Sequence, residues 1–313
     1  MSNPNFDQIL STTLKNHLPK LEDNVFSARP LAFFLKESGN IRTIDGGAKI
    51  VLPLIHALNN SSGSYSGVDP LTTTAAAGIT AAEYDWRQFY VTITISGIEE
   101  AQNSGTEALI DLLEAKTMQA EETITEKFDI MFFADGTGNS GKDWFGLGNL
   151  VKAHPNDTTI GGINPQSNAY WASNRTALGG PLTVAAMTTL FNTCSVGNDK
   201  PNVILTTQTL FEKYEALLQP QARYTDMKAA DAGFQNLMFK GTPVTYDVNT
   251  VAGDVFFLNS KYLRLVGHKD VWFKPTPFVR PENVDARFAQ ILCYGQLTAS
   301  NRKRQGVLTG ATA

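Results

Sequence analysis

A single long amphipathic helix, predicted over residues 106–134, constrains the fold of this 313-residue chain more than any other feature. Ser104 and Glu107 have the spacing of a capping box at its start. Apolar residues then recur at intervals of three and four, as on one face of a helix: Ile110, Leu113, Ala120, Ile124, Phe128 and Met131. The helix would be roughly 43 Å long, so the rest of the chain must be arranged along it.

Two β-rich segments before this helix are predicted to be the arms of one long hairpin. The first is residues 48–55, and the second is residues 83–96, where alternate apolar side chains share one face: Phe89, Val91, Ile93 and Ile95. The connection between them is rich in Ser, Thr, Asn, Gly and Ala and has too little apolar surface to form a core. An excursion of roughly 43 Å is longer than the chain's own core can cover, so the hairpin is expected to need an outside partner.

The first 44 residues contain short apolar groups separated by prolines, and we expect an arm that packs on something, a neighbouring copy being one candidate. Its main apolar residues are Leu31, Phe33, Phe34 and Leu35. The Gly-rich stretch 135–148 is expected to end the long helix, and a mixed α/β region follows. Its helices are expected over residues 183–194 and 209–218, and its strands over residues 202–206, 254–258, 262–266 and 288–298.

Charge and cysteine content limit the classes of function. The formal net charge is −4, from 26 basic and 30 acidic residues, which argues against a protein whose main task is to neutralise nucleic-acid phosphates. Charged residues are only 18% of the chain, and a surface poor in charge suits contact with other protein.

Cys194 and Cys293 form no CxxC motif, so we expect two buried thiols in a reducing compartment. With no signal peptide or membrane-spanning run in the sequence, we expect a cytosol-made, soluble, unprocessed chain without a membrane partner.

The segment from Gly136 to Lys142 fits both GxxxxGK and GxGxxG. A P-loop needs a strand before it, a helix after it and a hydroxyl residue after the lysine. Here a long helix precedes the segment, and Asp143 replaces the hydroxyl. We therefore expect a helix stop and a flexible loop, and keep a nucleotide-binding enzyme as a remoter alternative.

Candidate chemistry elsewhere is sparse. The four histidines are scattered, without metal-ligand spacing and without a serine–histidine–aspartate arrangement. We predict no catalytic residue, no metal site and no cofactor. The one basic cluster, Arg302, Lys303 and Arg304, is a candidate for a phosphate contact or for salt bridges at a strand end.

The order of these parts resembles that of the tailed-phage major capsid proteins, whose fold is named after the coliphage Hong Kong 97. The resemblance covers nearly the whole chain. It rests on the loop and its base (46–96), the long helix, the strand and helix from Asn202 onward, the strand entry Gly241-Thr-Pro-Val, and the ending from Tyr294 to Leu308.

The resemblance implies an α+β protein with the phage major-capsid fold. The expected segments are an N-terminal arm (1–45), an extended β-hairpin loop (46–98, with its tip about 57–82), a spine helix with the peripheral lobe (99–180), an axial α/β lobe (181–285), and a closing peripheral-lobe strand with the C-terminus (286–313).

The family also implies a structural, non-enzymatic role. Its subunits self-assemble through pentamers and hexamers into an icosahedral shell that encloses double-stranded DNA, so we expect a virion capsid assembled in the host cytoplasm. Expected partners are other copies of the chain, a portal protein, packaged DNA through weak nonspecific proximity, and a decoration protein as a further candidate. Because the extended loop begins near Gly46, we expect a separate scaffolding protein or none, rather than a scaffolding segment ahead of the arm. Two alternatives stay open: an encapsulin-like compartment of the same fold, and a tail or adhesion protein that forms trimers or fibres.

Candidate intersubunit contacts are chosen from composition and from position in the hairpin. They are Asn59 and Tyr65 near the tip, and Trp86, Arg87 and Phe89 on the returning strand. Residues 57–82 contain no lysine, so we expect no covalent lysine–asparagine crosslink of the kind that some relatives form.

Overall fold

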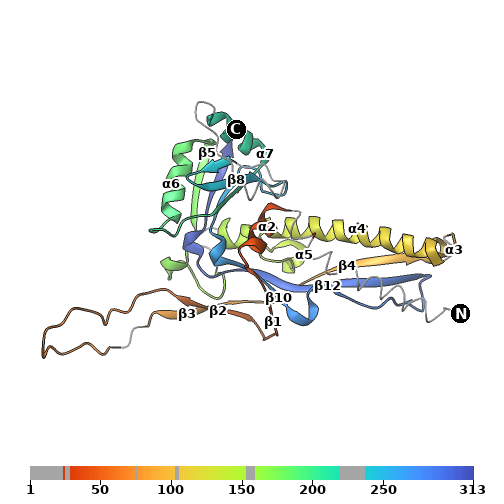
Figure 1. Cartoon of the computed structure of the whole chain (residues 1–313), viewed down its shortest axis with the longest axis horizontal. Helices are drawn as coiled ribbons and strands as arrows, with labels where there is room; N and C mark the ends of the chain where they lie inside the picture. Colours follow the sequence, from red (N-terminus) through yellow and green to blue (C-terminus); the bar gives the residue numbers. More distant parts are fainter. Residues whose placement is uncertain (1–23, 25–28, 75–76, 103–105, 153–158, 219–236) are drawn as a thin grey trace.

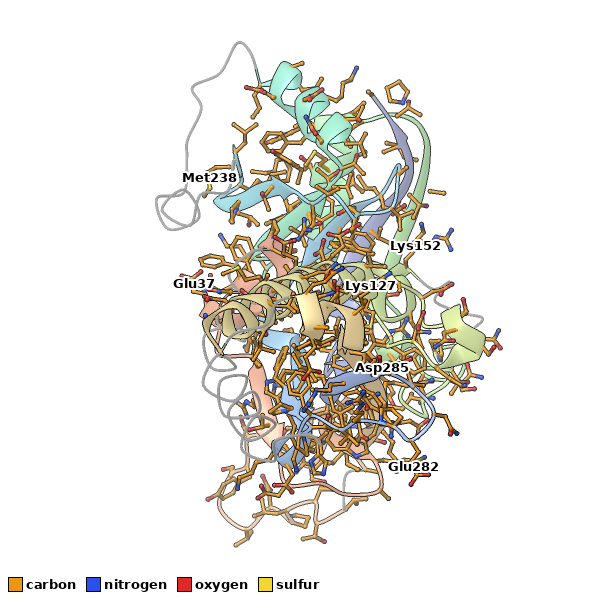
Figure 2. The ribbon with its side chains drawn as sticks, turned by 90° about the vertical axis from the view of Figure 1, so that its right-hand side faces the viewer. Glu37, Lys127, Lys152, Met238, Glu282 and Asp285 are labelled. Atoms are coloured by element: carbon orange, nitrogen blue, oxygen red, sulfur yellow. The ribbon has the colours of Figure 1, made fainter. Side chains whose placement is uncertain are left out.

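The computed structural model describes residues 24, 29–74, 77–102, 106–152, 159–218 and 237–313, and for residues 106–111 the backbone alone. At its centre is the long helix α4 (Thr106–Phe133). Figure 1 shows one lobe above this helix, a sheet below it, and a two-stranded ribbon that projects away from both. Within the described residues the strands form a five-stranded sheet, a six-stranded sheet and this ribbon. Seen along α4 in Figure 2, the two larger sheets lie on opposite sides of the helix.

The predicted long helix is confirmed, and its apolar stripe is the face that the protein buries. Leu113, Ala120, Ile124 and Phe128 are all at most 5% exposed. Phe128 is the centre of an aromatic cluster, and its ring lies 5.2–6.5 Å from those of Phe89, Phe132, Trp144, Trp272 and Phe273. Burial of this stripe, more than helix propensity, stabilises a helix of this length.

The Gly-rich stretch ends α4 and turns the chain back across its last turn. Gly136 has a φ of +78°, a left-handed conformation that glycine adopts at little cost. The Gly146 N–H donates to the Ala134 carbonyl oxygen over 3.1 Å, and a Cβ at Gly146 would lie only 2.3 Å from the Met131 carbonyl oxygen. Residues 136–142 therefore follow a helix rather than a strand, and lack the setting that a P-loop requires.

The five-stranded sheet packs on α4 through β4 (Arg87–Ser96), whose antiparallel neighbour is the longest strand, β12 (Ala286–Ala299). β10 (Leu263–His268) and β11 (Lys274–Pro275) are antiparallel to β12, and β1 (Ile41–Ile44) is parallel to β10. The sheet thus joins strands from the two ends of the chain.

Residues 83–96 were predicted as the returning arm of the hairpin, and this is wrong for residues 87–96, which form β4 of the five-stranded sheet. Ile93 and Ile95 are each 2% exposed, and Phe89 and Val91 pack against the same core. This alternating face is covered by helix α4 of the same chain and not by a neighbouring subunit. Alternation identifies the buried face of a strand, but it does not identify what buries that face.

The hairpin is shorter than predicted and pairs β2 (Ile50–Ile55) with β3 (Ile79–Tyr84). Residues 79–82 of its second strand lie in the stretch that was predicted as the tip. Ala81 and Ala82 leave this strand poor in large apolar side chains, which is why its sequence is similar to that of a loop. Together with the described connecting residues, 56–74 and 77–78, the two strands form the ribbon that projects in Figure 1.

The six-stranded sheet carries two helices, α6 (Val184–Cys194) and α7 (Gln208–Leu217), both of which the sequence predicted. Its strand order is β5 (Asn174–Pro181), β13 (Gly306–Thr312), β9 (Val255–Leu258), β6 (Val203–Thr206), β8 (Thr242–Tyr246) and β7 (Leu237–Phe239). Leu190, Phe191, Tyr214 and Phe257 belong to the core of this lobe, which is the upper lobe in Figure 1.

The lobes are not consecutive segments, and the predicted boundaries are wrong in this respect. β5, from the segment 99–180, and β13, from the segment 286–313, both lie in the six-stranded sheet. Conversely, β10 and β11, from the segment 181–285, lie in the five-stranded sheet. Each sheet is formed by strands that are distant in the sequence. A division of the chain into consecutive segments therefore cannot assign the strands to the correct sheet.

The apolar part of the predicted arm packs on its own chain. Helix α2 (Pro30–Glu37) buries Leu31 and Leu35, which are 1% and 0% exposed. The prediction for the rest of the arm falls on residues 1–23 and 25–28, which lie outside the described residues. The remaining elements are short: α3 (Gly97–Gln102), α5 (Gly138–Gly141), η1 (Gly148–Lys152), η2 (Ala169–Trp171), η3 (Ser260–Tyr262), η4 (Lys269–Val271) and η5 (Arg302–Arg304).

Candidate intersubunit surface

The ribbon of β2 and β3 has one face turned toward the body of its own chain. The side chains of this inward face are buried: Ile50, Leu52, Leu54, Ala82 and Tyr84. The Glu83 N–H also donates to the Gly161 carbonyl oxygen over 2.9 Å, which ties β3 to the body through the main chain. The base of the ribbon is therefore held firmly in place.

Apart from Glu83 at its base, the opposite face of the ribbon is apolar, and the described part of the chain leaves it exposed. Val51, Ile55 and Ile79 are 55%, 81% and 76% exposed, and Ile55 lies directly opposite Ile79 in the strand register. The loop adds four more exposed apolar side chains: Leu58, Tyr65, Val68 and Leu71. Apolar side chains gathered on one exposed element mark contact with another molecule, so this outer face of the ribbon is the candidate intersubunit surface.

Sequence reasoning missed Val51, Ile55 and Ile79 as contact residues. For the first two a signal was present, because residues 50–55 are apolar at every position. Such a run is typical of a strand covered on both faces, and the chain itself covers only one. For Ile79 no signal existed, since its strand was not recognised.

Two of the predicted contact residues, Asn59 and Tyr65, lie on the ribbon loop. The Tyr65 side chain is exposed. Asn59 Oδ1 accepts the Ser61 N–H over 2.9 Å, a local turn that shapes the start of the loop. Contact of these two side chains with a second copy stays a prediction.

The other three predicted contact residues have partners within their own chain. Trp86 Nε1 donates to the Gly47 carbonyl oxygen over 2.8 Å, and Arg87 donates to the Gly141 carbonyl oxygen. Phe89 packs edge-on against the aromatic cluster under α4. The structure therefore places all three at the five-stranded sheet and not on the ribbon.

The basic cluster forms the turn η5 between β12 and β13, and Arg302 is fully buried there. Its Nε donates to the Leu150 carbonyl oxygen over 2.8 Å, and its Nη1 donates to the Trp171 carbonyl oxygen over 3.2 Å. Burial lowers the pKa of this guanidinium to about 10, so it keeps its charge at neutral pH. A phosphate contact through Arg302 is excluded by this position, and the prediction is wrong for that residue.

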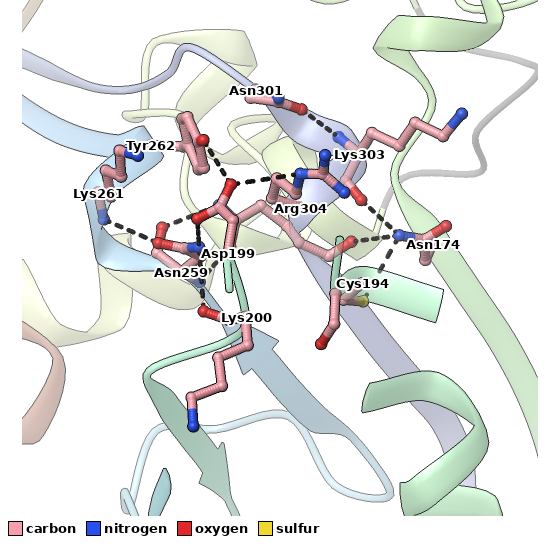
Figure 3. Close-up of polar contacts among 12 residues, drawn as sticks. Asn174, Cys194, Asp199, Lys200, Asn259, Lys261, Tyr262, Asn301, Lys303 and Arg304 are labelled. Carbon is pink, nitrogen blue, oxygen red and sulfur yellow. Dashed lines mark hydrogen bonds and ion pairs between the residues drawn. The ribbon is translucent and has the colours of Figure 1, made fainter. Parts of the chain in front are cut away.

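Arg304 forms an ion pair within its own chain. Its Nε lies 3.5 Å from Asp199 Oδ2, which also accepts the Tyr262 hydroxyl over 2.5 Å. Figure 3 shows Asp199 at the centre of this group, with Asn259 donating to its other oxygen. Burial and the neighbouring carboxylate raise the pKa of Tyr262. Since Tyr262 adjoins β10 and Asp199 precedes β6, the group holds the two sheets together at η5.

Lys303 is the exposed member of the basic cluster. Its carbonyl oxygen accepts a hydrogen bond from Asn174 Nδ2 over 2.6 Å, while its side chain points away from the group in Figure 3. Among the described residues, no cluster of three His, Cys, Asp or Glu side chains could hold a metal ion. In the same part of the chain, no helix is long and apolar enough to cross a bilayer.

No protein-family model and no curated protein matches the sequence. The folded chain, however, matches solved structures over most of its length. The cyanophage A-1(L) capsid asymmetric unit gives a TM-score of 0.65 at 17% identity, covering 88% of this chain and 91% of that one. The capsid of a native GTA particle gives a TM-score of 0.58 at 12% identity, covering 89% and 90%. The chain has the fold of the tailed-phage major capsid proteins.

The phage major-capsid fold is shared by encapsulins. The holo-SrpI encapsulin complex from Synechococcus elongatus PCC 7942 gives a TM-score of 0.55 at 10% identity, covering 88% of this chain and 87% of that one. In the terms of this fold, α4 is the spine helix and the ribbon of β2 and β3 is the extended loop. Identities this low establish the fold, and the function has to be argued from the surfaces.

Proposed function

We propose that this chain is a major capsid protein that assembles through pentamers and hexamers into an icosahedral shell enclosing double-stranded DNA. The observation that carries the proposal is the ribbon. One face holds it to its own chain, and the other presents Val51, Ile55 and Ile79 to a second molecule. The match in fold to phage capsids supports the same role.

The ribbon and the body of the subunit are different surfaces, so contact between them is heterologous. Head-to-tail contacts of this kind close into rings when the rotation between subunits allows it, as pentamers and hexamers require. Each contact can be weak, because a subunit in a shell makes several at once. Residues 56–74 contain a single charged side chain, Asp69, so covering the loop desolvates little charge.

We propose that the ribbon is received by the groove between β4 and α4 of the neighbouring copy. β4 pairs with β12 along one edge, and the residues that line the groove come from both faces of β4, so the groove follows its other edge. The groove has a volume of about 480 Å³. Tyr90 in its wall is 64% exposed, and Lys127, seen on α4 in Figure 2, carries the charge opposite to that of Asp69.

The partners of such a shell follow from the same proposal. The other copies of the chain are the main partner, with a portal protein, a separate scaffolding protein or none, and a decoration protein as further candidates. With a net charge of −4, the chain is suited to enclose DNA through proximity rather than to grip it. The shell would be assembled in the host cytoplasm and become part of the virion.

The experiment that tests the ribbon is the double substitution Ile55→Thr with Ile79→Thr. It removes apolar surface and keeps β-branched side chains in both strands. We expect a folded subunit by circular dichroism and no closed shells by negative-stain microscopy. Val196→Thr is the control, because Val196 is β-branched and 57% exposed but lies on the six-stranded lobe. Normal shells from the double variant would refute the ribbon as the contact, and deletion of residues 60–77 tests the loop in the same way.

The groove is tested separately by Tyr90→Asp, which places a charge where the ribbon would lie. We expect this variant to fold and to lose assembly as the ribbon variant does. Mixing the two variants adds a sharper test, since each keeps one intact half of the contact. Short oligomers from the mixture, with none from either variant alone, are expected if ribbon and groove are partners.

An encapsulin-like compartment is the second candidate, because an encapsulin shares the fold. Particles purified from the native source distinguish the two. Nuclease-resistant double-stranded DNA inside them supports the capsid, and a co-purifying protein cargo without DNA supports the compartment.

The nucleotide-binding alternative is left with little support, because residues 136–142 follow a helix and not the strand that a P-loop requires. We expect no nucleotide binding by calorimetry and unchanged assembly of Lys142→Ala.

A further inference from the structure

Two buried carboxyl groups, from different lobes, face each other beside the spine helix. Asp129 of α4 is 0% exposed, and Asp247, which follows β8, is 2% exposed. Asn249 bridges the two groups, because its backbone N–H donates to Asp247 Oδ1 over 3.1 Å and its side-chain Nδ2 donates to Asp129 Oδ2 over 2.6 Å. Asp129 Oδ1 and Asp247 Oδ2 are each buried, with no donor from the described protein directed at them. A polar oxygen buried in this way is costly unless it is hydrogen-bonded.

The described residues around the pair do not supply enough positive charge for both carboxylates. Arg29, at the start of α2, places its Nε 3.7 Å from Asp129 Oδ2, but it also pairs with Glu126 of α4. Asn249, from the loop after β8, donates to Asp129 Oδ2 over 2.6 Å. Among the residues that the structure describes, the charged groups that face the pair are one cation just before α2, one further carboxylate from α4, and the two aspartates themselves.

A single proton relieves this arrangement, because a protonated carboxyl group donates to the other carboxylate and removes one buried charge. Burial, followed by the charge of Asp247, raises the pKa of Asp129 from 3.8 to about 8, against the smaller opposing effects of Asn249 and Arg29. The two carboxyl groups therefore share one proton at neutral pH.

We propose that a proton shared by Asp129 and Asp247 latches the spine helix to the six-stranded lobe, and that losing it at mildly alkaline pH loosens the two. The contact joins three separate elements, namely α2 through Arg29, α4 through Asp129, and the end of β8 through Asp247. This latch is a property of the subunit, and it does not depend on the proposed shell.

The sign of the pH dependence follows from linkage. The pKa of Asp129 is higher in the folded chain than in the unfolded chain, so the folded state binds the proton more tightly. The stabilising effect is complete at low pH and is lost as the pH rises from about 4 to about 8. An ordinary salt-bridged carboxylate shows the opposite pH dependence, because its contribution to the stability of the fold is lost in acid.

The test is Asp129→Asn in the full chain, because the amide is neutral, has nearly the same shape and still donates to Asp247. Urea unfolding is measured from about pH 5 to about pH 9. Between about pH 5 and about pH 7, we expect the ratio of the unfolding constant of the unaltered chain to that of the variant to rise about tenfold per pH unit. Glu122→Gln is the control, since Glu122 is an exposed residue of the same helix, and its slope should equal that of the unaltered chain.

Infrared spectroscopy provides a second test that needs no refolding. We expect a carboxylic-acid C=O band at about pH 6 that disappears at about pH 9 and is absent from Asp129→Asn. Equal slopes for the unaltered chain and Asp129→Asn, or no acid band at about pH 6, would overturn the proposal. So would a slope that changes with chelator and calcium, because a divalent cation rather than a proton would then lie between the carboxylates.

Discussion

The buried hydroxyl of Tyr84 donates to the carbonyl oxygen of Ala299 over 2.9 Å, and so fastens the base of the ribbon to the longest strand of the five-stranded sheet. The Ala299 N–H in turn approaches the same hydroxyl oxygen at 3.3 Å. Burial raises the pKa of Tyr84 far above its ordinary value, so the hydroxyl keeps its proton and remains a donor. The direction of the ribbon is thus set by a bond within the subunit.

Tyr84→Phe is expected to lower the free energy of unfolding by about 1–3 kcal/mol, because the Ala299 carbonyl oxygen stays buried and loses its donor. Urea unfolding of the free subunit measures the change. Tyr65→Phe is the matched control, since Tyr65 is exposed on the loop, and its stability should be unchanged. Equal stability of the two variants would show that the Tyr84 bond contributes nothing.

Arg302→Met is expected to destabilise the subunit by about 3 kcal/mol, because the carbonyl oxygens of Leu150 and Trp171 lose a charged donor in the interior. Lys303→Met should change stability little, since that side chain is exposed. A DNA-binding measurement on both variants checks the alternative role of the cluster. If both lost DNA binding while keeping full stability, the cluster would be a phosphate site and not a structural turn.

Neither cysteine is expected to react while the chain is folded. Cys194 and Cys293 are both buried, and burial raises the pKa of the Cys194 thiol to about 12. Because the thiolate is the reactive form, a thiol reagent at about pH 8 should label neither residue until denaturant is added. Labelling of Cys194 in the native chain would mean that the core of the six-stranded lobe opens readily.

Acid should weaken the corner where β4 meets α3. The Ser96 N–H donates to Glu99 Oε2 over 3.0 Å, and Lys116 Nζ lies 3.0 Å from Oε1. These contacts, the Ser96 bond first, lower the pKa of Glu99 from 4.5 to about 2. Because the pKa of Glu99 is lower in the folded chain than in the unfolded chain, its charge stabilises the fold at a pH above 4.5. This stabilisation is lost as the pH falls from about 4.5 to about 2.

Glu99→Gln tests this corner. We expect the variant to be less stable than the unaltered chain at neutral pH, with a difference that narrows as the pH falls from about 5 toward about 2. Glu114→Gln, at an exposed position on α4, is the control. A difference that stayed constant with pH would assign the effect of Glu99→Gln to shape rather than to charge.

The spine helix could be predicted because its signals are local. Its buried stripe repeats at helical spacing, and its glycine stop follows directly in the sequence. The strand Arg87–Ser96 was recognised for the same reason, but its partner was not. It pairs with β12, in which Phe288 lies opposite Thr94, and no local pattern connects residues so far apart.

Burial of polar residues was the part that sequence could not supply. Arg302 and Lys303 are neighbours of the same type, yet one is enclosed by carbonyl groups from distant residues and the other is exposed. Asp129 adjoins Phe128 on a helix with many acidic residues, and only its tertiary partners distinguish it from the exposed ones. The burial and the partners of such residues are decided by the fold, and these in turn decide the hydrogen bonding and the pKa of each side chain.

The exposed outer face of the ribbon also affects a subunit that has not yet met a neighbour. A two-stranded ribbon with apolar side chains such as Ile55 and Ile79 in water is a template for indiscriminate β-pairing. The rate at which such chains are made must therefore be matched by the rate at which correct partners cover them. Overproduction without a partner would favour precipitation, so the same ribbon sets both the affinity of correct contacts and the concentration of free chain that a cell can tolerate.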